Sequence, residues 1–168
     1  MKKALVLIYD GFNEFEINLP CYILKNMGLD VVTLSINHKE PIVHGSIGFI
    51  LKPQIFIKEL IDVDKYEVFI IPGGENNSLY KCNELFSLIQ KFQEMNKIIA
   101  TISNGKKLLI EAGIHGSDIL PCANEVEVNN NIIIAKELSV VKFSEQILQE
   151  LGLYEKGKVE KLKNLSYI

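Results

Sequence analysis

The sequence predicts an α/β protein in which helices cover both faces of a mostly parallel central sheet. Aliphatic runs without alternating polar residues recur along the chain, and such runs are typical of strands buried on both faces. Stretches with apolar residues at helical spacing separate these runs, and three runs end abruptly in turns that contain glycine. The 168 residues fit a single domain over residues 1–168, and residues 154–168 are predicted to be a basic C-terminal tail.

The first part of the chain predicts a strand, a helix and a second strand. Lys3–Tyr9 is almost continuously aliphatic, and Asp30–Ile36 is rich in β-branched residues. Between them, Phe15–Met27 has helical spacing, although Pro20 is an awkward interior residue because it lacks an amide hydrogen. We therefore expect this helix either to bend at Pro20 or to begin close to Leu19.

The next part predicts a small excursion followed by a buried strand. Pro41–Val43 and Phe49–Leu51 flank a turn with two glycines, which is typical of a hairpin or an extended loop. Ile55–Leu60 is expected to form a short helix. Tyr66–Ile71 is another aliphatic strand, and the Pro-Gly-Gly sequence at 72–74 ends it.

The remaining elements continue the alternation of helix and strand. Leu79–Met95 has helical spacing, Lys97–Ile102 follows as a strand, and Lys106–Ala112 is expected to be helical after a sharp turn. Farther along, Ile132–Ala135 predicts a strand and Val140–Leu151 a helix. This order is typical of strands that run parallel and are joined by crossover helices.

Charge and hydropathy limit the kinds of partner. Lys and Arg number 18 and Asp and Glu 21, giving a net charge of −3, whereas phosphate binding needs a basic face. No apolar run approaches the roughly 20 residues that span a bilayer. The first apolar run is followed by acidic residues and not by a signal-peptide cleavage site. We therefore expect a cytoplasmic protein that binds neither nucleic acid nor membranes.

The cysteines point to no metal site. Cys21, Cys82 and Cys122 lack the spacing of metal ligands, and an odd number of free thiols fits a reducing compartment. We expect neither a bound metal nor a cofactor.

Candidate chemistry gathers at the carboxyl ends of three strands. Ligands of open parallel sheets bind along this edge. There the sequence places Asp10-Gly11, Pro72-Gly73-Gly74 and Ser103-Asn104-Gly105. Because parallel strands share the edge, we expect these turns to converge on one pocket.

The third turn resembles a nucleophile elbow, in which a strand runs into a strained turn at the start of a helix. Ser103 would be the reactive residue, and Asn104 and Gly105 would belong to an anion-binding turn. Alternatively, Ser103 and Asn104 only cap the helix. In the same way, Gly73 and Gly74 either offer N–H donors to a substrate or form a tight turn that needs positive φ.

Glu16 is the third candidate, because it lies near the expected start of the first helix. A carboxylate buried in the pocket would have a raised pKa and could act as an acid or base. Alternatively, Glu16 is a solvated residue that the helix dipole stabilises. Glu14 competes for the same role.

Four segments together resemble the ThiJ/PfpI superfamily, a branch of the class I glutamine-amidotransferase-like proteins. The resemblance runs from residue 2 to about Ala112 and resumes around Ile132–Leu151. The segments that carry it are Lys3–Phe12, Glu16 with Pro20, Val68–Gly74 and Ile98–Gly105.

The resemblance implies a flavodoxin-like three-layer sandwich that is usually a homodimer. It also implies a site with an elbow cysteine, a protonated glutamate hydrogen-bonded to it, and backbone N–H groups that bind an oxyanion. Glu16 falls on the family's glutamate, and Gly73 and Gly74 fall on its Pro-Gly-Gly turn. Asn104 and Gly105 follow the elbow as the family's small residues do.

The departures from the family bear on the chemistry. Ser103 stands where the family has cysteine, Asn104 stands where many active members have histidine, and His115 does not align with a catalytic histidine. Either the serine was engineered or it is natural, and the unusual Asn104 and Lys106 favour natural divergence. A serine needs an adjacent general base, for which only Glu16 is placed, and a protonated carboxyl cannot act as one.

Three functions follow from these residues. The first is a diverged family member that binds a small carbonyl- or carboxylate-bearing metabolite without cysteine-type catalysis. The second is an amidase-, hydratase- or glyoxalase-like enzyme, a hydrolase or lyase that uses Ser103 and Glu16 on a small molecule. The third is a dimeric regulatory or interaction module.

Cys21 either replaces the missing thiol or is a packing cysteine.

Overall fold

Seven strands form one sheet in the computed structural model, which describes residues 2–36, 40–114, 123–157 and 160. The strand order is β5-β2-β1-β6-β7-β9-β8, and all neighbours are parallel except β8 and β9. Two further strands, β3 and β4, pair as an antiparallel hairpin. The strands are β1 (Lys3–Leu7), β2 (Asp30–Ser35), β3 (Val43–His44), β4 (Ile50–Leu51), β5 (Ile55–Phe56), β6 (Tyr66–Ile71), β7 (Ile98–Ile102), β8 (Val126–Asn129) and β9 (Ile132–Ala135).

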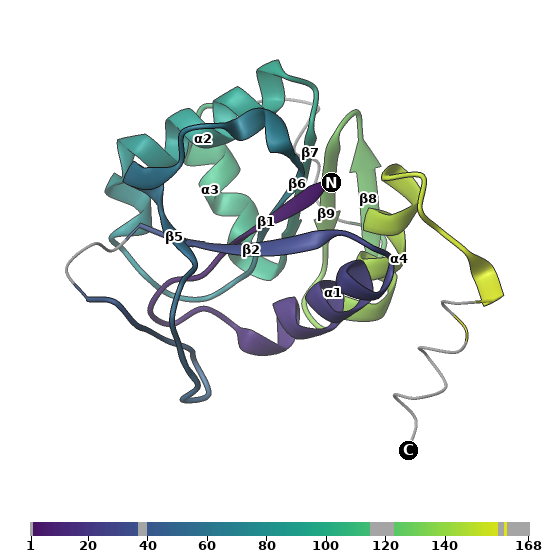
Figure 1. Cartoon of the computed structure of the whole chain (residues 1–168), viewed down its shortest axis with the longest axis horizontal. Helices are drawn as coiled ribbons and strands as arrows, with labels where there is room; N and C mark the ends of the chain where they lie inside the picture. Colours follow the sequence, from purple (N-terminus) through teal and green to yellow (C-terminus); the bar gives the residue numbers. More distant parts are fainter. Residues whose placement is uncertain (1, 37–39, 115–122, 158–159, 161–168) are drawn as a thin grey trace.

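Helices cover both faces of this sheet (Figure 1). Two of them, α1 (Glu14–Asn26) and α4 (Val140–Glu150), contact each other on one face. The other two, α2 (Asn83–Glu94) and α3 (Lys106–Glu111), contact each other on the opposite face. The residues of Ala4–Ile8 are fully buried, because the two layers of helices leave the central strand no exposed side. The predicted three-layer, flavodoxin-like α/β fold is confirmed.

The chain order reverses at β1. The connection from β1 leads to β2 on one side, whereas β6 and the later strands lie on the other side. Such a switch point leaves a crevice between the carboxyl ends of the two neighbouring strands, where open α/β sheets bind ligands. Here the crevice lies between the ends of β1 and β6, and the elbow after β7 adjoins it.

Helix α1 begins at Glu14 and not close to Leu19. The reason is a capping residue, because the Asn13 side chain accepts a hydrogen bond from the Phe15 backbone N–H at 3.1 Å. Pro20 therefore lies inside the helix, where it is buried.

The edges of the sheet differ from the prediction. Ile55–Phe56, expected as the start of a short helix, is the strand β5, which pairs with the end of β2. Only Ile57–Glu59 is helical, as one 3-10 turn. Strand β8 was not predicted, because its alternating pattern is only four residues long and it gains its partner only from β9.

Several predicted features lie outside the described residues. They are His115, Cys122 and residues 158–159 and 161–168 of the predicted tail. Among the helices that the structure describes, none is both long and apolar enough to cross a membrane.

Candidate functional site

The turn after β7 has the backbone geometry of an elbow. Ser103 adopts φ +59°, a left-handed conformation that is uncommon for any residue except glycine, and its side chain is half-buried. A 3-10 turn over Ser103–Gly105 then leads directly into α3. Gly105 is buried, and a Cβ there would lie 2.7 Å from the Ile71 carbonyl oxygen. A glycine is therefore needed for the elbow to pack against the end of β6.

The Pro-Gly-Gly turn is held against the loop that follows β1. The Asn13 backbone N–H donates to the Gly73 carbonyl at 2.9 Å, and Phe12 and Gly74 form an isolated antiparallel bridge. Gly74 has φ +144°, and a Cβ there would lie 2.9 Å from the Tyr9 hydroxyl oxygen. Only glycine fits this position, both for its backbone and for the space around it.

The predicted site residues meet above Gly73. A Cβ built on Gly73 would lie 2.8 Å from Ser103 Cβ, 2.8 Å from Asn104 Oδ1 and 3.0 Å from Glu16 Oε2. Side chains from α1 and from the elbow therefore share one small space at the ends of β6 and β7. The turn formed by Asp10 and Gly11 is connected to this space through Phe12.

Glu16 is buried in this space and is not a solvated helix residue. The Gly73 N–H donates to Glu16 Oε2 at 2.6 Å and Asn13 Nδ2 donates to Oε1 at 3.2 Å, and Ser103 lies close to the same carboxyl. Burial raises the pKa of Glu16, and the negative charge of Glu137 raises it further. The hydrogen bonds act in the opposite direction without cancelling the burial.

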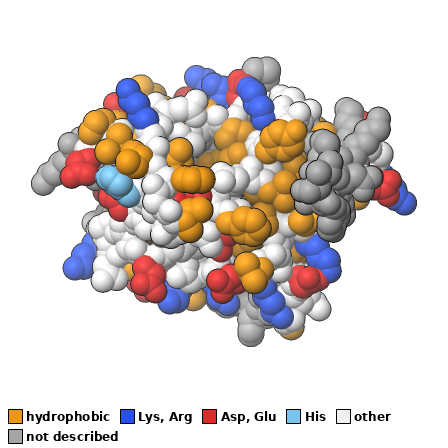
Figure 2. Space-filling model, turned by 90° about the horizontal axis from the view of Figure 1, so that it is seen from below, with side chains coloured by type: hydrophobic (Ala, Val, Ile, Leu, Met, Phe, Trp, Pro, Cys, Tyr) orange, Lys and Arg blue, Asp and Glu red, His pale blue; other side chains and the backbone are white. Residues whose placement is uncertain are grey.

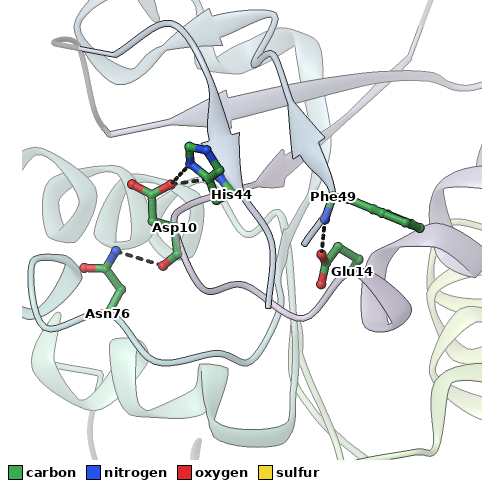
Figure 3. Close-up of polar contacts among 5 residues, drawn as sticks. All are labelled: Asp10, Glu14, His44, Phe49 and Asn76. Atoms are coloured by element: carbon green, nitrogen blue, oxygen red, sulfur yellow. Dashed lines mark hydrogen bonds and ion pairs between the residues drawn. The ribbon is translucent and has the colours of Figure 1, made fainter. Parts of the chain in front are cut away.

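Glu14 is also buried, but it faces the β3–β4 hairpin (Figure 3). Its carboxylate accepts hydrogen bonds from Ser46 Oγ at 3.0 Å and from the backbone N–H groups of Ile47 and Phe49 at 3.2 Å. Burial raises the pKa of Glu14, but these bonds and one from its own backbone N–H outweigh it and hold the pKa below its ordinary value. Of the two competing glutamates, Glu14 fixes the hairpin and Glu16 lies beside Ser103.

The hairpin is anchored at a second point, also visible in Figure 3. The His44 backbone N–H donates to Asp10 Oδ1 at 2.8 Å, and the His44 Nδ1 lies 3.5 Å from the same oxygen. Asn76 Nδ2 donates to the Asp10 carbonyl at 2.9 Å. Asp10 thus ties the hairpin to the loop after the Pro-Gly-Gly turn.

The side chain of Asn104 makes a contact that the sequence did not predict. The Gly74 backbone N–H donates to Asn104 Oδ1 at 2.8 Å, and Asn104 Nδ2 donates to the Gly74 carbonyl at 3.1 Å. The elbow and the Pro-Gly-Gly turn are therefore joined by two hydrogen bonds to one glycine. A side-chain bond of this kind depends on two loops meeting, so nothing in the local sequence indicates it.

An open cleft of about 460 Å³ borders the site at Gly74 and Asn104. This volume is within the range of small-molecule sites. Lys107 brings a positive charge to the cleft, and Glu75 brings a negative one. The cleft is lined by Gly74, Glu75, Asn76, Asn77, Tyr80, Asn104 and Lys107.

Three further residues lie near Glu16 or the Pro-Gly-Gly turn, although the sequence indicated no role for them there. Asn13 bonds Glu16, and its position before an acidic first turn is the ordinary signal of a helix cap. Tyr9 donates to the Pro72 carbonyl at 3.1 Å, and burial raises the pKa of its hydroxyl. Tyr9 and Glu137 carry no sequence signal, because their closeness to Glu16 follows from the order of the strands.

Cys21 offers no substitute for a thiol at the elbow. Cys21 is packed against the core, and burial raises the pKa of its thiol to about 12. Such a thiol is protonated at neutral pH and unreactive. In the part of the chain that the structure describes, no three His, Cys, Asp or Glu side chains gather as they would around a metal ion.

Comparison with known proteins gives consistent relatives. The profile of the DJ-1/PfpI family matches residues 2–148. A protein of Thermococcus kodakarensis named a deglycase is 28% identical over 113 residues, which cover 67% of this chain and 66% of that relative. The match thus spans about two thirds of the relative's length.

Solved structures share the fold. A DJ-1 superfamily protein of Agrobacterium tumefaciens superposes with a TM-score of 0.85 at 17% identity, over 99% of this chain and 98% of that chain. Drosophila melanogaster DJ-1beta superposes with a TM-score of 0.82 at 21% identity, over 100% of this chain and 99% of that chain.

Proposed function

This chain belongs to the DJ-1/PfpI family, as its resemblance to the ThiJ/PfpI superfamily predicted, and from that premise we propose that it binds a small carbonyl- or carboxylate-bearing metabolite without cysteine-type catalysis. The observation that carries the proposal is the meeting of Ser103, Glu16 and Asn104 above Gly73. A hydroxyl, a carboxyl and an amide there are suited to hold a small polar molecule. The adjoining cleft, with the cationic Lys107, has room for the rest of it.

The chemistry of serine is the reason for placing binding ahead of catalysis. The family's reaction, as the resemblance implies it, needs a thiolate at the elbow, and the hydroxyl of Ser103 does not ionise at neutral pH. The buried Glu16, with its raised pKa, is a poor general base for that hydroxyl. Cys21 packs against the core with a pKa of about 12 and cannot supply the thiolate instead.

Titration with glyoxylate, followed by amide NMR, tests the proposal. Glyoxylate carries both an aldehyde and a carboxylate, and we expect saturable shifts around Ser103 and Lys107. Ser103→Ala and Lys107→Ala should each weaken binding about tenfold, the size of one hydrogen bond to a charged group. Lys142→Ala, on α4, is the matched control and should leave binding unchanged. An absence of saturable binding at millimolar glyoxylate would contradict the proposal.

A second function is favoured by the closeness of Ser103 to the Glu16 carboxyl and by the strained φ of Ser103. These are features of a nucleophile paired with an acid or base, as a small-molecule hydrolase, hydratase or lyase needs. If this function is the right one, the chain turns over p-nitrophenyl acetate or methylglyoxal. The turnover then disappears in both Ser103→Ala and Glu16→Gln.

We also propose that the chain forms a homodimer through the face that carries α1 and the hairpin. Figure 2 shows hydrophobic side chains gathered on this face. Five large apolar residues there are between 52% and 68% exposed, which is costly for a surface in water. These residues, called the apolar patch below, are Phe15, Tyr22, Ile47, Phe49 and Ile50.

A further inference from the structure

The backbone donors of the Pro-Gly-Gly turn are already engaged. The Gly73 N–H donates to Glu16 Oε2 at 2.6 Å, and the Gly74 N–H donates to Asn104 Oδ1 at 2.8 Å. A turn of this kind next to an elbow is where a reacting or bound oxyanion would find its N–H donors. Both donors instead face oxygens of the chain itself.

The orientation of the Asn104 amide is fixed by its two bonds. Its oxygen faces the Gly74 N–H and its nitrogen faces the Gly74 carbonyl, at 2.8 and 3.1 Å. A flipped amide would place donor against donor and acceptor against acceptor, so both bonds would be lost. Asn104 Oδ1 therefore stays over the turn, 2.8 Å from the point where a Cβ of Gly73 would lie.

We infer that the Asn104 side chain fills the oxyanion-binding place of the elbow and thereby determines which ligands the site accepts. While Asn104 is in place, an oxyanion cannot reach the Gly74 N–H without breaking both hydrogen bonds of the amide. It would also lie against the oxygens of Asn104 and Glu16, which repel it. The negatively charged end of a ligand consequently lies in the open cleft beside Lys107 and not at the turn.

This inference deepens the proposed function, on which it rests for the place of the ligand. Its core can nevertheless be tested without any metabolite. A thiol introduced by Ser103→Cys displaces iodide from both iodoacetate and iodoacetamide, and the two reagents differ in the charge that the elbow must accept. Both rates are proportional to the fraction of the thiol that is ionised, so this fraction cancels in their ratio. The ratio therefore reports how well the elbow accepts the carboxylate of iodoacetate compared with the neutral amide.

We expect Asn104→Ala, added to Ser103→Cys, to raise the iodoacetate to iodoacetamide ratio about tenfold, because the Gly74 N–H becomes free to bind the carboxylate. Asn104→Asp keeps an acceptor for that N–H and adds a negative charge, so it should lower the ratio. Asn26→Ala removes an exposed asparagine at the end of α1, outside the cleft, and should leave the ratio unchanged. Peptide mapping assigns the alkylation to position 103.

A ratio that stays within twofold after Asn104→Ala would overturn the inference. A second measurement on the unsubstituted chain does not depend on the folding of any variant. In a titration with acetate, the amide proton of Gly74 should not shift, whereas the resonances around Lys107 should. A shift of the Gly74 amide comparable to those around Lys107 would also overturn the inference. If glyoxylate fails to bind but the alkylation ratio responds, the proposed function fails and the role of Asn104 stands.

Discussion

At the scale of single residues, Thr101 in β7 carries a buried polar atom without a partner. Its hydroxyl is one of the few buried side-chain oxygens that lack a hydrogen bond within the described residues. A buried hydroxyl without a hydrogen bond destabilises the fold, because it has lost its hydrogen bonds to water. An apolar group of the same shape has no such cost. We expect Thr101→Val to raise the free energy of unfolding by about 1 kcal/mol, measured by urea denaturation.

Thr33 in β2 is the matched control for this prediction. Its hydroxyl accepts a hydrogen bond from the Gln54 backbone N–H at 3.0 Å, so Thr33→Val should lower the free energy of unfolding by about 1 kcal/mol. Equal effects of the two substitutions would show that the unmet hydroxyl of Thr101 is not the cause.

Cys21 provides a second prediction at this scale. Because burial raises the pKa of its thiol to about 12, we expect iodoacetamide at neutral pH not to label Cys21 in the folded chain. The same thiol should be labelled fully in denaturant, as seen by mass spectrometry of the peptide. Rapid labelling in the native state would contradict this prediction and would support Cys21 as a replacement for the missing elbow thiol.

At the scale of elements, Glu14 connects α1 to the hairpin. Its lowered pKa means that it stabilises the fold above the pKa of the unfolded chain, and that this stability is lost as pH falls through the lower folded pKa. We expect Glu14→Gln to lower the free energy of unfolding by about 1–2 kcal/mol at neutral pH. The difference from the unsubstituted chain should shrink in urea denaturation under acidic conditions.

Glu16, two residues away, should show the opposite sign. Its pKa is raised, so its contribution to stability is fully present below the unfolded pKa and is lost as pH rises through the folded pKa. The free energy of unfolding of Glu16→Gln, relative to the unsubstituted chain, should therefore increase with pH over this range. For each variant, the difference in the free energy of unfolding from the unsubstituted chain is followed as a function of pH. If this difference changed with pH in the same direction for Glu14→Gln and Glu16→Gln, the assignment of one glutamate to the hairpin and the other to the pocket would be contradicted.

The sequence could not distinguish these two glutamates, and the reason is physical. Both lie in the first turn of α1, and both are buried. A helix alone would leave Glu14 in solvent, but the hairpin folds over it, and a Cβ at Gly45 would overlap its carboxylate. The partner that buries Glu14 lies some 30 residues farther along the chain, so no local pattern indicates it.

The strands likewise divide into those that their own residues predict and those that depend on a distant partner. The aliphatic runs of β1, β6 and β7 are buried on both faces, and their composition alone predicted them. The two-residue β5 and the antiparallel β8 were missed because they exist through their pairing with β2 and β9 at the edges.

At the scale of the whole molecule, the apolar patch predicts the state of assembly. We expect the chain to be a dimer in sedimentation velocity, and Phe15→Ser or Ile47→Ser to weaken the dimer at least tenfold by removing apolar area from the contact. Ile61 is 92% exposed but lies outside the patch, so Ile61→Ser should leave the dimer intact. A monomeric unsubstituted chain would contradict the proposed homodimer.

The meeting of Ser103, Glu16 and the Pro-Gly-Gly turn could be anticipated because parallel strands bring their carboxyl ends to one edge. The hydrogen bonds between those turns could not. The bonds of Asn104 to Gly74 depend on ångström-scale distances between loops, and such distances emerge only when the sheet is assembled.

The position of β1 has a consequence for any attempt to trim or tag this protein. Near the start of the sequence, β1 is also the third of seven strands across the sheet. Deleting Lys3–Leu7 would remove an interior strand and not an edge strand. It would separate β2 and β5 from the other four strands of the sheet. An N-terminal fusion partner should therefore be joined before Lys3, with β1 left intact. Even a short N-terminal truncation that enters β1 would disrupt an interior strand of the sheet.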